Sequence, residues 1–218
     1  MTLITDRTKG IGYIISDVSD HLMGELKNAS MEGVDVINSQ QTESIHQYAA
    51  NDRLAGNIEF EYFIHHNEHL SSLITQEVLG MIPTLNRSCP EHPFASALVS
   101  KHAFKLDNLW FNFQKKHEFN PPHFHSGMYS FVIWVSVPFL MENEVVKSPL
   151  GRSQKNNKAG CFEFLYPNPY GRIGITTLPV DKRFEGKMCL FYSDLVHTVY
   201  PFYSSDDFRI SVSGNLTI

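Results

Sequence analysis

The chain contains 218 residues (24.9 kDa), of which 42% are hydrophobic and 19% charged, and its formal net charge is -5. A chain of this length and apolar content can bury a core of its own, which excludes a mainly disordered protein. The acidic balance argues against a protein that binds nucleic acid by neutralising phosphates. We therefore expect one folded domain that binds no nucleic acid.

The cysteines and the apolar runs predict a cytoplasmic protein. Cys89, Cys161 and Cys189 are far apart and odd in number, so they indicate neither a disulfide framework nor a C-x-x-C metal site. The first residues lack the basic and then apolar run of a secretory signal. The most apolar stretch, Phe131–Met141, is too short to span a membrane. We expect no membrane partner, and the oligomeric state cannot be read from the sequence.

Residues 1–104 predict a mixed, partly helical extension that packs on the rest of the chain. A short helix is expected over His21–Lys27, capped by Asp17 or Ser19. A second helix is expected over Glu59–Leu79, with Pro83 just beyond its end.

Residues 105–218 predict a β-rich core instead. About seven short strands are separated by turn-forming residues, with no segment long enough for a crossover helix. The expected strands are Asn108–Gln114, Tyr129–Val137, Cys161–Tyr166, Ile173–Val180, Lys187–Ser193, His197–Phe202 and Phe208–Leu216. Such a pattern is typical of an antiparallel sandwich or jelly roll, so the predicted class is mainly β with an N-terminal helical extension.

Two histidines, His123 and His125, follow a pair of prolines, and His197 comes much later. On an extended segment the side chains of residues i and i+2 project to the same side, so both imidazoles can approach one metal ion. His197 can complete the site if its strand lies beside this segment. Imidazole suits Fe, Cu, Ni and Zn, and three protein ligands leave open positions for other molecules. From spacing alone, ordinary hydrogen-bonded histidines remain an equal alternative.

The final expected strand carries a polar row on one face. Alternation places Arg209 and Ser211 on the same side, together with Ser213 and Asn215. An arginine inside a small barrel suits a carboxylate ligand, because guanidinium binds carboxylate in a planar, bidentate manner. Alternation cannot show whether this face points inward, so a solvent-exposed face stays open. The same periodicity groups Trp110, Asn112 and Gln114 on one face of their strand.

The order of these motifs resembles the 2-oxoglutarate-dependent non-haem Fe(II) oxygenases, especially a group of short oxygenases from phages and bacteria. The resemblance covers roughly the C-terminal half and depends on a Trp-x-Asn strand, an H-x-H, a strand that follows a glycine, a distal histidine and a final R-x-S strand. The matching residues are Trp110 and Asn112, His123 and His125, Ser130 to Trp134, Gly186 to Ser193, His197, and Arg209 with Ser211.

The resemblance implies a double-stranded β-helix (a jelly roll, cupin-like) that holds Fe(II) between His123, His125 and His197. It also implies that Arg209 and Ser211 bind the far carboxylate of 2-oxoglutarate, with Asn112 a further candidate for contact with the cosubstrate. Such enzymes couple the conversion of 2-oxoglutarate and O2 to succinate and CO2 to the hydroxylation of an unactivated C–H bond. A small-molecule or peptidyl substrate is expected.

One departure from the family pattern concerns His125, which stands where most relatives have a carboxylate. Two other ligand sets therefore stay open. Either His125 and His197 bind alone, with a halide in the vacant position as in H-x-G oxygenases, or a carboxylate such as Asp194 or Glu118 completes the site. The i, i+2 projection favours three histidines.

Two other functions also fit the sequence. One is a three-histidine, cupin-like metalloenzyme that uses no 2-oxoglutarate, in which Arg209 is structural. The other is a non-catalytic jelly-roll binding or structural protein. Metal content and 2-oxoglutarate binding discriminate among the three.

Overall fold

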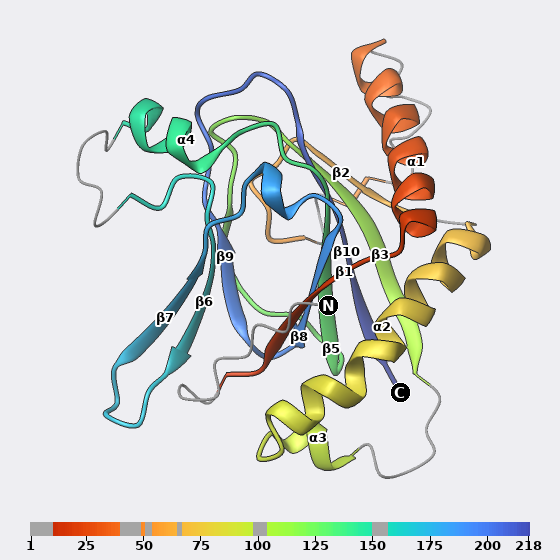
Figure 1. Cartoon of the computed structure of the whole chain (residues 1–218), viewed down its shortest axis with the longest axis vertical. Coiled ribbons are helices and arrows are strands. Elements are labelled where there is room, and N and C mark those ends of the chain that lie inside the picture. The colour runs from red at the N-terminus through yellow and green to blue at the C-terminus, as the bar shows by residue number, and fades with distance from the viewer. Residues whose placement is uncertain (1–10, 40–48, 51–53, 65–66, 98–103, 150–156) are drawn as a thin grey trace.

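A computed structural model describes residues 11–39, 49–50, 54–64, 67–97, 104–149 and 157–218. Two antiparallel sheets lie face to face, and two long helices pack beside the larger one (Figure 1). The strands are β1 (Tyr13–Asp17), β2 (Phe60–Phe63), β3 (Lys105–Gln114), β4 (Asn120–His123), β5 (Tyr129–Ser136), β6 (Phe162–Pro167), β7 (Ile173–Leu178), β8 (Lys187–Tyr192), β9 (Val196–Val199) and β10 (Arg209–Thr217). The helices are α1 (Asp20–Asn38), α2 (Glu68–Ser88), α3 (Pro93–Ala97), α4 (Met141–Lys147) and the 3-10 turn η3 (Lys182–Phe184).

The larger sheet has the strand order β1-β8-β5-β10-β3-β2, and the smaller has the order β4-β9-β6-β7. α1 and α2 cover one face of the larger sheet, where Leu22, Ile74 and Val212 belong to one apolar cluster. A second cluster, which includes Trp134 and Phe164, lies between the sheets. This is the predicted double-stranded β-helix with helices added by the N-terminal region. Within the described part of the chain, no helix is long and apolar enough to cross a membrane.

Alternation on β3 and β10 follows the prediction. Pairing places Ser211 opposite Asn112, and Arg209 opposite Gln114. These four side chains line a cavity between the sheets. The residues that alternate with them, such as Phe113 and Val212, point to the helices. The polar row is therefore inside the molecule.

The N-terminal region differs from the prediction because it supplies two strands as well as helices. β1 pairs with β8 and β2 pairs with β3, so both edges of the larger sheet come from residues before Lys105. Neither strand was predicted. Alternation over four or five residues is too short to separate from part of a helix.

Helix boundaries in this region were also predicted wrongly. The helix expected over Glu59–Leu79 is instead the strand β2 followed by α2, which begins after Asn67, whose Oδ1 accepts from the N–H of Leu70 at 2.9 Å. Pro83 lies inside α2 on its exposed side. A proline inside a helix costs roughly 3 kcal/mol. The buried side chain of Ile82 precedes the proline, that of Leu85 continues the apolar face past it, and their burial offsets that cost.

Three elements after Lys105 were missed: α4, β4 and the 3-10 turn η3. α4 comes shortly after the expected strand Tyr129–Val137, in a segment for which no helix was predicted. β4 contains Pro121 and Pro122, which predict a turn. β4 is an edge strand beside β9, where proline is tolerated because one side of the strand needs no hydrogen bond.

Candidate active site

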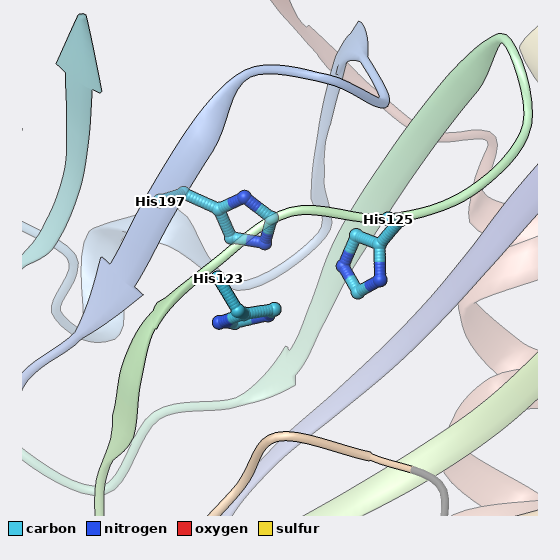
Figure 2. A group of neighbouring side chains, drawn as sticks. All are labelled: His123, His125 and His197. Carbon is cyan, nitrogen blue, oxygen red and sulfur yellow. The ribbon is translucent and has the colours of Figure 1, made fainter.

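Three histidines from two strands and a loop meet in the cavity. His123 ends β4 and lies directly opposite His197 of β9. His125 follows β4, and its N–H donates to the carbonyl oxygen of Ser193 at 2.9 Å. The three rings face one another (Figure 2), with centroids 4.3 Å apart for His123 and His197 and 5.0 Å apart for the other two pairs. One ligand atom from each residue lies within 4.8 Å of the others.

Backbone carbonyls orient two of the imidazoles. His123 Nδ1 lies 2.7 Å from the carbonyl oxygen of Pro121, and His197 Nδ1 lies 2.9 Å from that of Leu195. A carbonyl only accepts, so each Nδ1 carries the proton and each Nε2 presents a lone pair. This is the tautomer and orientation that a metal ligand needs.

Burial keeps all three rings neutral. It lowers the pKa of His123, lowers that of His125 to about 4 and lowers that of His197 well below its ordinary value. Repulsion between protonated imidazoles that share the cluster opposes a second protonation and lowers the pKa of His125 and His197 further. Metal ions bind deprotonated imidazole, so these three rings would need to lose no proton to bind a metal ion near pH 7.

Aromatic side chains enclose the cluster. The ring of Phe162 stacks on His197 at 5.4 Å with an interplanar angle of 13°, and Phe191 contacts the same imidazole edge-on. Trp110 lies 5.7 Å from the ring of His125. These contacts fix the rings and keep water from much of their surface.

Arg209 lines the same cavity and is 3% exposed. Gln114 Oε1 accepts from its Nε at 2.9 Å and from its Nη2 at 2.6 Å. The carbonyl oxygens of Gly160 and Tyr200 accept from Nη1 and Nη2 at 2.8 and 3.0 Å. Within the described residues no carboxylate forms an ion pair with it, so every acceptor is neutral. Burial lowers the pKa of Arg209 to about 10, and the group stays charged near pH 7.

Asn112 and Ser211 lie between the arginine and the histidines on the cavity wall. Asn112 Oδ1 accepts from Trp110 Nε1 at 3.2 Å, and its Nδ2 donates to Ser211 Oγ at 3.3 Å and Ser213 Oγ at 3.4 Å. This network turns the polar faces of β3 and β10 into one hydrogen-bonded wall. All the predicted site residues therefore line one cavity.

A family model described as "Putative 2OG-Fe(II) oxygenase" matches residues 108–215, which contain all of these side chains. The C-terminal half of the chain belongs to the 2-oxoglutarate/Fe(II) oxygenase family. The protein is accordingly a 2-oxoglutarate-dependent oxygenase, an oxidoreductase whose cofactors are Fe(II) and 2-oxoglutarate. A comparison with curated protein sequences finds no significant match.

Solved structures share the fold of this oxygenase at low identity. AviO1 from Streptomyces viridochromogenes aligns with a TM-score of 0.54 at 12% identity, covering 100% of this chain and 96% of its own. A prolyl hydroxylase from Trichoplax adhaerens gives 0.52 at 12% identity, covering 94% and 83%. The viral collagen prolyl hydroxylase of Paramecium bursaria Chlorella virus-1 gives 0.51 at 10% identity, covering 94% and 96%. At these identities the likeness concerns the fold.

The donor set of the oxygenase fits an iron ion and an anionic cosubstrate. Three neutral imidazoles suit Fe(II), and the buried guanidinium matches a carboxylate. The carboxylates considered from the sequence lie elsewhere. Asp194 is exposed and its Oδ1 lies 3.3 Å from His92 Nε2, whereas Glu118 accepts from the N–H groups of Glu59 and Lys115. Within the described residues, the group of potential ligands contains imidazoles alone.

Sequence reasoning did not assign two residues near the oxygenase cavity. Gln114 was placed on the correct face, but its bidentate contact with Arg209 depends on strand register, which periodicity does not provide. Glu61 was placed in an expected helix, although it is a buried residue of β2 opposite Asn112. A lone glutamate in a short segment gave no signal.

Proposed function

We propose that this oxygenase hydroxylates an unactivated C–H bond of a small-molecule or peptidyl substrate. His123, His125 and His197 hold Fe(II) in this proposal, and Arg209 binds the far carboxylate of 2-oxoglutarate. The overall reaction balances as substrate, 2-oxoglutarate and O2 converted to hydroxylated product, succinate and CO2, with one oxygen atom entering each organic product. Bound Fe(II) supplies the oxidising chemistry.

One observation carries the proposal: a buried guanidinium with no carboxylate partner among the described residues shares a cavity with three converging imidazoles. A buried cation whose hydrogen-bond acceptors are all neutral is costly. The charge of Glu144 offsets part of that cost, and a carboxylate ligand would offset more. A dicarboxylic cosubstrate fits because one carboxylate can reach Arg209 while its oxoacid end lies toward the histidines.

The remaining residues of the wall position these groups. Gln114 fixes the plane of the guanidinium, so that its binding geometry exists before the cosubstrate arrives. Ser211 and Asn112 offer a hydroxyl and an amide beside it. Phe162 and Phe191 pack against His197 and restrict water near the reacting groups.

The proposal is tested by titrating 2-oxoglutarate into the metal-loaded protein without O2. Arg209→Met should weaken binding at least about 10-fold, because a charged hydrogen-bonded pair is lost. Arg183→Met is the matched control, since Arg183 is exposed and paired with Asp181 and Glu142 outside the cavity. Unchanged 2-oxoglutarate affinity in Arg209→Met would contradict the assignment and favour the cupin-like alternative.

A second measurement addresses the reaction itself. Succinate release is followed with a panel of amino acids, peptides and other small molecules, and the products are analysed for added oxygen. The panel includes prolyl peptides because two structural neighbours are prolyl hydroxylases. Succinate formation that always proceeds without substrate oxidation would rule out the hydroxylase.

A further inference from the structure

Glu61 is a buried carboxyl group with an unused acceptor. It lies opposite Asn112 in the pairing of β2 with β3, which puts its side chain on the cavity face of the larger sheet. The residue is 1% exposed, and its Oε2 has no hydrogen-bond partner in the described structure. A buried carboxyl oxygen without a donor is uncommon and costly, so it calls for a partner.

A second unused acceptor lies beside it. Asn120 begins β4, lines the cavity with His123, and has a buried Oδ1 that likewise lacks a partner in the described structure. A Cβ atom added to Gly56 would lie 2.4 Å from this oxygen and 2.6 Å from Glu61 Oε1. The two side chains therefore come together over a glycine, and any side chain at residue 56 would displace them.

Among the described residues, the charged group that acts on Glu61 is the carboxylate of Glu118. Burial and the nearby carboxylate of Glu118 raise the pKa of Glu61 to about 7. Lys115 lies on the same edge of the molecule, but its Nζ is 2.6 Å from Glu59 Oε2. A ligand that satisfies both oxygens must donate hydrogen bonds. A cationic ligand would also favour the ionised form of Glu61, which a pKa of about 7 leaves only partly populated near pH 7. An ammonium group does both, because it carries three donors and one positive charge.

We infer that Glu61 and Asn120 form a subsite for an ammonium group of the primary substrate, at the side of the cavity that begins with β4. Asn120 lines the same cavity as Arg209, whose guanidinium suits an anion, so the cavity offers groups of both charge preferences. The anionic cosubstrate is repelled from Glu61 and the amine from Arg209, so each molecule has one orientation. The role of this subsite in substrate selection rests on the proposed function, whereas its binding of an amine does not.

The experiment uses a series of linear primary alkylamines as probes, with the matched alcohols and carboxylates for comparison. Binding to the Fe(II)- and 2-oxoglutarate-loaded protein is measured without O2, by calorimetry and thermal shift. Amines of suitable length should bind, and their alcohol and carboxylate counterparts should bind at least about 10-fold more weakly, as expected when a charged hydrogen bond is lost.

Two variants locate the amine. Glu61→Gln keeps the size of the side chain and should lower amine affinity at least about 10-fold while leaving 2-oxoglutarate affinity unchanged. Asn120→Leu should lower amine affinity less, because it removes a neutral acceptor. Glu59→Gln, an exposed glutamate two residues from Glu61, is the matched control and should bind amines like the parent.

Several outcomes would overturn the subsite. One is that no amine binds the parent protein, and another is that Glu61→Gln binds amines unchanged. A lower melting temperature with unaltered amine binding would make the pair structural only. The two proposals fail separately: if Arg209→Met still binds 2-oxoglutarate, the proposed function fails, although amine binding at Glu61 can stand.

Discussion

The two faces of the strand pair β3 and β10 are both buried, but one is apolar and the other is polar. Toward the helices, Phe113 and Val212 join an apolar cluster with residues of α1 and α2. Toward the smaller sheet, Gln114 and Arg209 are equally buried but polar, and they line the cavity. The same backbone thus carries a stabilising face and a face that lines the cavity, and only the alternation of side chains separates them.

The cavity face is costly to the apoprotein because it buries a cation and three neutral imidazoles. The helix face offsets that cost by burying apolar surface, roughly 25 cal/mol for each Å². The comparison predicts that changes on the cavity face alter ligand binding, whereas changes on the helix face alter folding stability. The variants below test these two properties.

The largest effect is expected for His197→Ala, which removes an imidazole at the centre of the cluster. Loss of a partner that only supports a ligand costs roughly 10- to 100-fold in metal affinity, so loss of a proposed ligand should cost at least about 100-fold. Fe(II) affinity is measured by anaerobic titration. His69→Ala, on the exposed side of α2, is the control and should bind iron like the parent. Equal iron binding by both variants would remove His197 from the ligand set.

The next largest effect is on the helix face. Ile74→Ala deletes a fully buried side chain of α2 and should lower the free energy of unfolding by about 2–5 kcal/mol. Metal and 2-oxoglutarate affinities of the folded protein should not change. Denaturant unfolding measures the first property and titration the second. Leu79→Ala, on the same helix but 39% exposed, should cost less. Altered 2-oxoglutarate affinity in Ile74→Ala would show that the two faces are coupled.

The same division explains what the sequence predicted. The polar and apolar faces of β3 and β10 follow from period-two alternation, and that pattern places Arg209 with Ser211 and Trp110 with Asn112 correctly. The convergence of His123 and His125 follows from i, i+2 projection. Long-range pairing was not predictable from any local pattern, and it decides that His197 lies opposite His123 and that Gln114 meets Arg209. The edge strands β1 and β2 depend on the same non-local pairing.

A pH dependence should arise on the cavity face of the metal-free protein. The pKa of His125 is lowered to about 4 in the fold, against about 6.5 in an unfolded chain. As the pH falls, the unfolded state therefore binds the proton first. The contribution of His125 to the free energy of unfolding is fully present above pH 6.5 and is lost as the pH falls toward 4. The free energy of unfolding should fall by about 1 kcal/mol per pH unit for each group that titrates in this way.

The measurement is the melting temperature of the metal-free protein across this range, compared with that of His125→Phe. The parent should show the steeper fall below pH 6.5, because the variant lacks one group that gains a proton on unfolding. The difference between the two curves cancels the contributions of groups whose pKa His125 does not affect, including Glu61. His197 is not among these groups, because His125 lowers its pKa. Parallel curves would mean that His125 binds protons equally in the folded and unfolded states.

The smallest effect is expected for substitutions of Gln114. They distinguish the charge of Arg209 from the orientation of its guanidinium as the property that 2-oxoglutarate binding needs. In the parent, Gln114 Oε1 accepts from Nε and Nη2 of Arg209. Gln114→Glu replaces the side-chain amide by a carboxylate and so gives the guanidinium a charged partner inside the protein. Since the internal carboxylate competes with the cosubstrate for the same charge, 2-oxoglutarate affinity should fall about 10-fold. Gln114→Met removes the orienting acceptor without adding charge and should weaken binding less. If Gln114→Met weakens binding as much as Gln114→Glu, orientation is what the glutamine supplies; if neither variant alters binding, the cosubstrate does not depend on this guanidinium.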